Sequence, residues 1–181
     1  MPLIAPALGA GLAVALWTLP VGDWIGGFEA HMLRHAALVS VVPALIAPAL
    51  TARLAPPVAV GAGLEAVAAW GWHLPGAHMA ALLSPLHGLA EQASFLVAVL
   101  AVWWGAVAAR PLAGTGALLL TLVHMTMLGA AILLAPRVLY PYCDLDAQAR
   151  GAMLMLAVVV PTYLAGGLVL ARRALDDGAP A

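Results

Sequence analysis

Long apolar stretches alternate with short polar segments along most of this chain. Six of them are long enough to form membrane-spanning helices, at residues 3–19, 28–50, 58–74, 84–108, 114–135 and 151–171. A helix needs about 20 apolar residues to cross the hydrocarbon core of a bilayer, with a lower limit near 17. Because irregular backbone in lipid would leave peptide groups without hydrogen bonds, helices are the expected form. The pattern predicts an all-α fold, a polytopic membrane helix bundle with about six transmembrane helices in a single domain.

The first stretch, residues 3–19, has two interpretations. It could be a signal peptide that is removed, or a transmembrane helix that is retained. No basic residue precedes it, and no clear small-x-small cleavage site follows it within a polar region. Signal peptides normally have both features, so we expect a retained helix.

Serine and proline mark where some of these helices begin or bend. Ser84 and Pro85 predict the start of the fourth helix, because serine is a good N-cap and proline suits the first helical position. Pro43 and Pro48 lie inside the second stretch, where each removes a backbone hydrogen bond. We expect a kink there, which is tolerated when a neighbouring helix supplies replacement partners.

The placement of arginine predicts the orientation of the bundle. Cytoplasmic loops of membrane proteins carry an excess of basic residues. With six spans, one side receives Arg53, Arg110, Arg172 and Arg173, whereas the other receives Arg137 and Arg150, with Arg34 just inside a helix. We therefore expect the first side to face the cytoplasm, which puts both termini in the cytoplasm.

Composition supports a membrane location and excludes one class of partner. The chain is 65% hydrophobic and 8% charged, with a mean hydropathy of +1.04, whereas soluble domains are about half apolar and a quarter charged. Membrane lipid is therefore an expected partner. The formal net charge of −1 argues against nucleic acid. The single cysteine, Cys143, cannot form an internal disulfide.

Most histidines lie towards the outer side of this layout: His31, His35, His73 and His87 near the ends of spans, and His78 in the loop that we expect between the third and fourth spans. His31 and His35 stand four residues apart, so their imidazoles share one helix face. His87 and Glu91 have the same spacing at the start of the fourth span. Ionisable groups inside a span usually face the bundle interior. We therefore expect a shared outward-facing site, although a single membrane histidine is often only an interhelical hydrogen-bonding residue.

Sulfur-containing residues near the histidines suggest copper. Met32 is next to His31, Met127 lies on roughly the same face as His124 in the fifth span, and Cys143 is in the outer loop. Imidazole, thioether and thiolate ligands together suit copper, and soft sulfur favours Cu(I). The expected cofactor is therefore copper, as Cu(I) or Cu(II). Because metal binding requires neutral imidazole, loading should weaken below about pH 6.5. The predicted metal ligands are His31, His35, His73, His87 and His124, with Glu91, Met32, Met127 and Cys143 as auxiliary groups.

Five sequence motifs follow one another over roughly residues 28–170. They are HMLRH in the second span, WGWHLP closing the third, PLHGLAEQASF opening the fourth, VHMTMLGAAILLAP in the fifth, and YPYCDLDAQARGAMLML leading into the sixth. Their order and spacing resemble the polytopic CtaG family of caa3-type cytochrome c oxidase assembly factors. The resemblance implies roles for the five histidines above, and it adds Asp146 and Gln148 of the outer loop as auxiliary residues.

The resemblance also implies a location and partners. It implies a multi-pass protein of a bacterial plasma (inner) membrane that helps to build cytochrome c oxidase by handling or delivering copper. Its partners would be an oxidase subunit or another copper-handling protein. The histidine site would then face the periplasmic side.

Two other functions fit the same residues. Haem could be held between two histidines on facing helices, for example one from the second span with His87 or His124, although there is no C-x-x-C-H motif. A proton-linked transporter could use Glu65 and Glu91. An enzyme is not expected, because the sequence shows no nucleophile–base pair and no phosphate-binding loop.

Overall fold

The computed structural model describes residues 4–178 of the chain as a bundle of helices, with no strand among these residues. In chain order the elements are α1 (Ile4–Thr18), α2 (Val21–Ile25), α3 (Gly27–Ala36), η1 (Ala37–Val41), α4 (Val42–Ile46), η2 (Ala47–Ala49), η3 (Ala52–Leu54), α5 (Val58–His73), α6 (Pro75–Leu83), α7 (Pro85–Ala108), α8 (Pro111–Leu133) and α9 (Leu145–Gly178). The predicted all-α fold is confirmed.

Four helical segments are long and apolar enough to cross a membrane: Gly27–Ala49, Pro85–Ala108, Pro111–Leu133 and Leu145–Asp177. They correspond to the second, fourth, fifth and sixth expected spans and indicate a membrane protein. α1 and α5 have only 15 and 16 residues, so each extends about 22–24 Å against a hydrocarbon core of about 30 Å. Leu3, where the first expected span begins, lies outside the described residues. The count of six spans stays a prediction.

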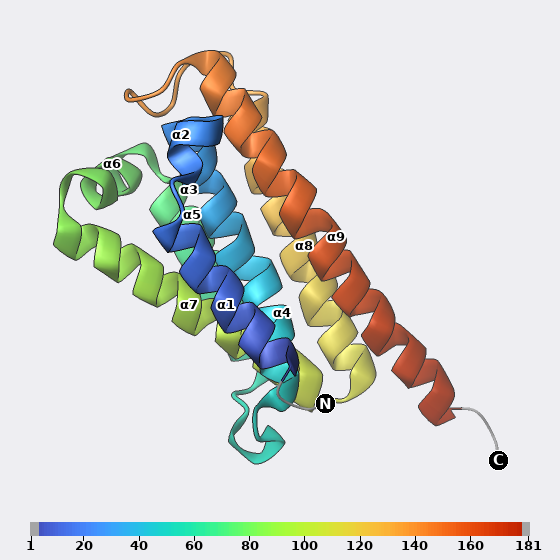
Figure 1. The fold of residues 1–181 in the computed structure, drawn as a ribbon. Helices are drawn as coiled ribbons and strands as arrows, with labels where there is room; N and C mark the ends of the chain where they lie inside the picture. Colours follow the sequence, from blue (N-terminus) through green and yellow to red (C-terminus); the bar gives the residue numbers. More distant parts are fainter. Residues whose placement is uncertain (1–3, 179–181) are drawn as a thin grey trace.

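The helices run between two ends of the bundle (Figure 1). The short helices α2 and α6 and the loop between α8 and α9 gather at the upper end of this view, whereas η3, the start of α1 and the end of α9 lie at the lower end. α8 packs against α9, α9 also packs against α3, and α5 packs against α7. The described ends of the chain therefore emerge at the same end of the bundle.

α5 and α7 approach each other closely at Gly61. A Cβ atom at this position would lie 2.6 Å from backbone atoms of Ala101 and Val102 on α7, a distance that no side chain tolerates. Small residues allow this close approach of helices in membrane proteins. Because α5 carries His73 and α7 carries Glu91, this contact helps to position both residues.

The second span changes helix type near its centre, where Ala37–Val41 forms a π-helical turn. Pro43 accounts for the change, because it has no N–H to donate to the Val39 carbonyl four residues earlier. That carbonyl instead accepts a hydrogen bond from the Tyr163 hydroxyl of α9 at 2.7 Å. A neighbouring helix thus supplies the missing partner.

The segment between α5 and α7 is a short helix, α6, and not the loop that the sequence predicts. Leu74 is extended, with a ψ of 133°, because the proline that follows disfavours a helical conformation for the residue before it. Pro75 then begins α6, which ends at Leu83, just before the extended residue Ser84. The Ser84 side chain caps α7 by accepting from the His87 N–H, so the predicted helix start is confirmed. The two breaks let α6 pack against α7 at the upper end.

The loop between α8 and α9 is held by Gln148, whose side chain is fully buried. Its Oε1 accepts from the Leu139 N–H at 2.7 Å. Its Nε2 donates to the carbonyls of Ile132 and Arg137 at 3.2 and 3.4 Å. Both donors and the acceptor of the amide therefore have backbone partners, which indicates that Gln148 shapes this loop.

Candidate metal site

Two imidazoles and a carboxylate meet between α3 and α7. Ligand atoms of His31, His35 and Glu91 all lie within 4.8 Å of one another. The Nε2 atoms of His31 and His35 are 2.9 Å apart, so one ring donates a hydrogen bond to the other. The Oε1 atom of Glu91 lies 3.5 Å from His35 Nε2. These groups are close enough to bind one metal ion together.

Two further imidazoles surround this group. The His78 ring centre lies 4.8 Å from that of His31, and His78 Nδ1 lies 3.8 Å from Glu91 Oε1. The His73 ring centre lies 6.4 Å from that of His35 and 6.3 Å from that of His78. Four of these five side chains are buried, and His31 is half-buried. We call His31, His35, His73, His78 and Glu91 the histidine cluster.

His78 is absent from the ligands predicted from the sequence, which places a loop at its position. The signal that could have found it is Pro75 and the run AHMAALL from Ala77 to Leu83, which is rich in alanine, methionine and leucine. Proline at the first helical position and a run of good helix formers indicate a helix. The sequence does not indicate, however, that α6 packs against α7.

Hydrogen bonds from neighbouring groups orient the imidazoles. His73 Nδ1 lies 2.7 Å from the Ala69 carbonyl. Because a carbonyl only accepts, Nδ1 carries the hydrogen, and Nε2 of the neutral ring has a free lone pair. The Tyr142 hydroxyl forms a hydrogen bond with His78 Nε2, which ties the α8–α9 loop to the cluster. Nothing in the sequence pattern pointed to this role for Tyr142.

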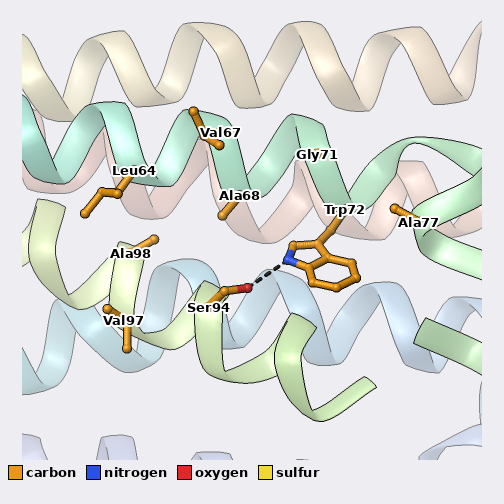
Figure 2. A pocket seen from close by; sticks show the side chains of 9 residues that line it. All are labelled: Leu64, Val67, Ala68, Gly71, Trp72, Ala77, Ser94, Val97 and Ala98. Carbon is orange, nitrogen blue, oxygen red and sulfur yellow. Dashed lines mark hydrogen bonds between the residues drawn. The ribbon is translucent and has the colours of Figure 1, made fainter. Parts of the chain in front are cut away.

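A side-chain hydrogen bond also joins α5 and α7 beside the cluster, and two more lie within α7 next to it. Figure 2 shows a mostly apolar groove across which Trp72 of α5 points towards Ser94 of α7. The Trp72 indole N–H donates to the Ser94 hydroxyl at 2.8 Å, and that hydroxyl donates to the Glu91 carbonyl at 3.0 Å. The Gln92 amide donates to Glu91 Oε2 at 3.1 Å. These bonds hold the turn that carries Glu91 next to the end of α5.

Three buried polar atoms in and beside the cluster have no hydrogen-bond partner: His35 Nδ1, His73 Nε2 and Gln92 Oε1. Buried polar atoms are nearly always partnered, so each exception needs an explanation. In His73 the unpartnered atom is the lone pair through which imidazole binds metal. A free lone pair among imidazoles and a buried carboxylate fits a cation.

A pocket of about 530 Å³ opens beside His31. Its lining includes Glu29, Tyr142, Cys143 and Arg150. Glu29 and Arg150 neutralise each other through an ion pair with an Nε–Oε1 distance of 2.8 Å. Because His31 is the half-buried member of the cluster, the pocket gives an ion a route to it.

Several predicted ligands lie outside the cluster. His87 is exposed, and its Nδ1 bonds the N-cap serine of α7 at 2.9 Å. His124 of α8 bonds Glu65 of α5 at 2.6 Å. Asp146 is exposed, and the polar atoms of Gln148 are engaged with the backbone. The structure therefore brings His31, His35, His73 and Glu91 together, but not these four residues.

The predicted sulfur ligands do not join the cluster either. Met32 is fully buried in the hydrophobic core and lies against Gly151 of α9. Met127 is 59% exposed. Cys143 lines the pocket, and its thiol donates to the Tyr140 carbonyl at 3.3 Å. The cluster therefore offers imidazole nitrogen and carboxylate oxygen as its donors.

The metal-free protein should become less stable as the pH decreases, because of His78. Burial, together with the neighbouring His31 and His73, lowers the pKa of His78 from its usual 6.5 to about 3. Below about pH 6.5 the unfolded chain takes up a proton at this residue, whereas the folded protein does not, so stability falls as pH falls. Between pH 7 and pH 5 this group should cost about 2 kcal/mol of unfolding free energy.

Unfolding in detergent at these two pH values checks this prediction. We expect His78→Asn to lose about 2 kcal/mol less than the wild type on acidification. Equal acid sensitivity in the wild type and His78→Asn would contradict the prediction.

Comparisons of the chain with protein-family models, with curated protein sequences and with solved structures return no match. No family membership is therefore shown.

Proposed function

We propose that this chain is a membrane-embedded assembly factor for cytochrome c oxidase that handles or delivers copper through the histidine cluster. The observation that carries the proposal is that ligand atoms of His31, His35 and Glu91 lie within 4.8 Å of one another. The ordered motifs that resemble the CtaG assembly factors support the oxidase, or another copper-handling protein, as the partner.

The donor set favours Cu(II) over Cu(I). Imidazole and carboxylate suit Cu(II), whereas Cu(I) is selected by thiolate and thioether groups, which the cluster lacks. Imidazole nitrogens bind such ions at about 2.0–2.1 Å. Two nitrogens at this distance from one ion, with an angle of about 90° between the two bonds, lie about 2.9 Å apart. The Nε2 atoms of His31 and His35 have this separation, 2.9 Å. Among divalent first-row ions, Cu(II) binds most tightly to ligands of this kind.

The proposed topology has six spans, with α1 and α5 as the two shorter ones. Two observations support cytoplasmic termini. The described ends of the chain share one end of the bundle (Figure 1), and the turns at that end carry Arg53 and Arg110. The histidine cluster at the other end would then face the periplasmic side of a bacterial plasma (inner) membrane.

Metal analysis of the purified full-length protein tests the proposal. We expect about one Cu(II) per chain after loading and removal of unbound metal, and preference for copper when Zn(II) competes. An optical spectrum of the untreated sample tests the bis-histidine haem alternative. A Soret band that responds to dithionite, or protein that binds no copper, would contradict the copper proposal.

A further inference from the structure

A mostly apolar pocket of about 290 Å³ opens between the second span and α9, in the half of the bundle opposite to the histidine cluster (Figure 1). The face of α9 that lines it runs from Thr162 to Arg173. Ala44 and Pro48 of the second span and Trp103 of α7 also contribute to its lining. α9 packs against α3 and η1 but not closely against α4 or η2, which leaves this space open.

The pocket has the depth of one bilayer leaflet. Thr162 and Arg173 mark the two ends of its α9 face, and their separation in the sequence corresponds to about 16 Å along the helix axis. The hydrocarbon core of a bilayer is about 30 Å thick. The pocket therefore extends from the end of the span, where Arg173 lies, to about the middle of the membrane.

The width of the pocket selects its occupant. An α-helix with its side chains is at least about 10 Å wide, so 290 Å³ would hold less than one turn of a helix from a partner protein. A single hydrocarbon chain is much thinner and can follow the whole length of the groove. The Thr162 hydroxyl donates to the Val158 carbonyl of its own helix at 2.7 Å, so the inner end asks for no polar partner. These features fit an acyl chain.

A positive charge lies at the mouth of the pocket. Arg173 is exposed, and among residues 4–178 no carboxylate lies within ion-pair distance of its guanidinium. The neighbouring Arg172, in contrast, faces Asp176, with an Nε–Oδ2 distance of 3.9 Å. A guanidinium with free N–H groups binds phosphate oxygens well.

The charges around the mouth favour a negative headgroup over a zwitterionic one. In the described part of the chain, this end of the bundle has more arginines than aspartates: Arg53, Arg110, Arg172, Arg173, Asp176 and Asp177. The pocket lining contains no carboxylate that could accept the ammonium group of a zwitterionic lipid. Basic pockets between membrane helices are typical binding sites for anionic lipid headgroups.

We propose that this pocket binds one anionic phospholipid, with an acyl chain in the groove and the phosphate at Arg173. The bound lipid contacts both the end of the second span and α9, and so fills the space that these two segments leave between them. The site lies in the leaflet opposite to the histidine cluster. It therefore gives the protein a lipid specificity that does not depend on metal binding.

Native mass spectrometry of the delipidated, full-length protein in detergent tests this proposal. Dioleoyl phosphatidylglycerol and dioleoyl phosphatidylcholine, which have the same chains, are titrated separately and the one-lipid adducts are counted. We expect the anionic lipid to bind about tenfold more tightly, since hydrogen bonds to charged groups are the stronger ones. Arg173→Gln should remove this preference. Ala165→Phe, a change at an exposed residue of the lining, should fill the groove and weaken binding of the anionic lipid by about tenfold or more.

Two matched variants control for general effects of charge and bulk. Arg172→Gln removes the same charge from the next residue, which does not line the pocket, and Leu168→Phe adds a ring at an exposed position outside it. Both should bind the anionic lipid as the wild type does. Equal affinity for the two lipids, equal losses in Arg172→Gln and Arg173→Gln, or binding that Ala165→Phe leaves unchanged would overturn the proposal. Copper is absent from this measurement, so its result is independent of the proposed copper site.

Discussion

Replacing His31 and His35 together by alanine should abolish copper binding by the purified protein. The change removes two of the three residues whose ligand atoms lie within 4.8 Å of one another. Loss of a single supporting group around a metal site already weakens binding about 10–100-fold, so we expect the loss of two imidazoles to exceed that range. Competition with a copper chelator of known affinity measures the dissociation constants of variant and wild type.

His87→Ala is the matched control for this variant. His87 is also a histidine at the start of a helix, but it is exposed and bonds only the N-cap serine of α7. Its removal should leave the copper affinity unchanged. In cells that use this protein for oxidase assembly, the double variant should lower the cytochrome c oxidase activity of the membranes, and His87→Ala should not. If the double variant keeps full copper and supports normal oxidase activity, the proposed mechanism is wrong.

Gly61→Ala should destabilise the bundle by about 2–3 kcal/mol, although alanine is the better helix former. The added methyl group would stand 2.6 Å from the backbone of Ala101 and Val102, so α5 and α7 would have to move apart. The displacement would also move His73 relative to Glu91. We therefore expect lower copper affinity together with a lower thermal unfolding midpoint in detergent.

Gly63→Ala provides the control on the same helix. A Cβ atom at Gly63 would meet nothing within 4 Å. This variant should be as stable as the wild type or more stable by up to about 1 kcal/mol, because alanine has the higher helix propensity. Equal unfolding midpoints for the two alanine variants would show that the α5–α7 contact at Gly61 does not limit stability.

The helical class of the fold could be predicted from the sequence because lipid leaves few alternatives. The second, fourth, fifth and sixth apolar stretches are long enough for a span, and in a bilayer such stretches must satisfy their own backbone hydrogen bonds. The start of α7 could also be predicted, since Ser84 and Pro85 act on the backbone next to them. Local chemistry is sufficient for features of this kind.

Contacts between distant residues could not be predicted in the same way. His87 and Glu91 have the helical spacing that His31 and His35 also have, yet Glu91 is buried in the cluster and His87 is exposed. α6 packs against α7 and places His78 next to Glu91, whereas His87, one turn before Glu91 on the same helix, stays exposed. Spacing along one helix contains no information about which turn of that helix a neighbour covers.

By itself, the sequence determined an all-helical membrane protein and a pair of imidazoles on one face of the second span. The sequence also predicted that His73 and Glu91 join this pair. Only the tertiary structure decided that His78 joins it in place of His87, and that His124 instead meets Glu65. The physical reason is that helical periodicity sets which side chains share a face. Which faces meet depends on the close approach at Gly61 and on the break at Leu74, where residues far apart in the chain come into contact.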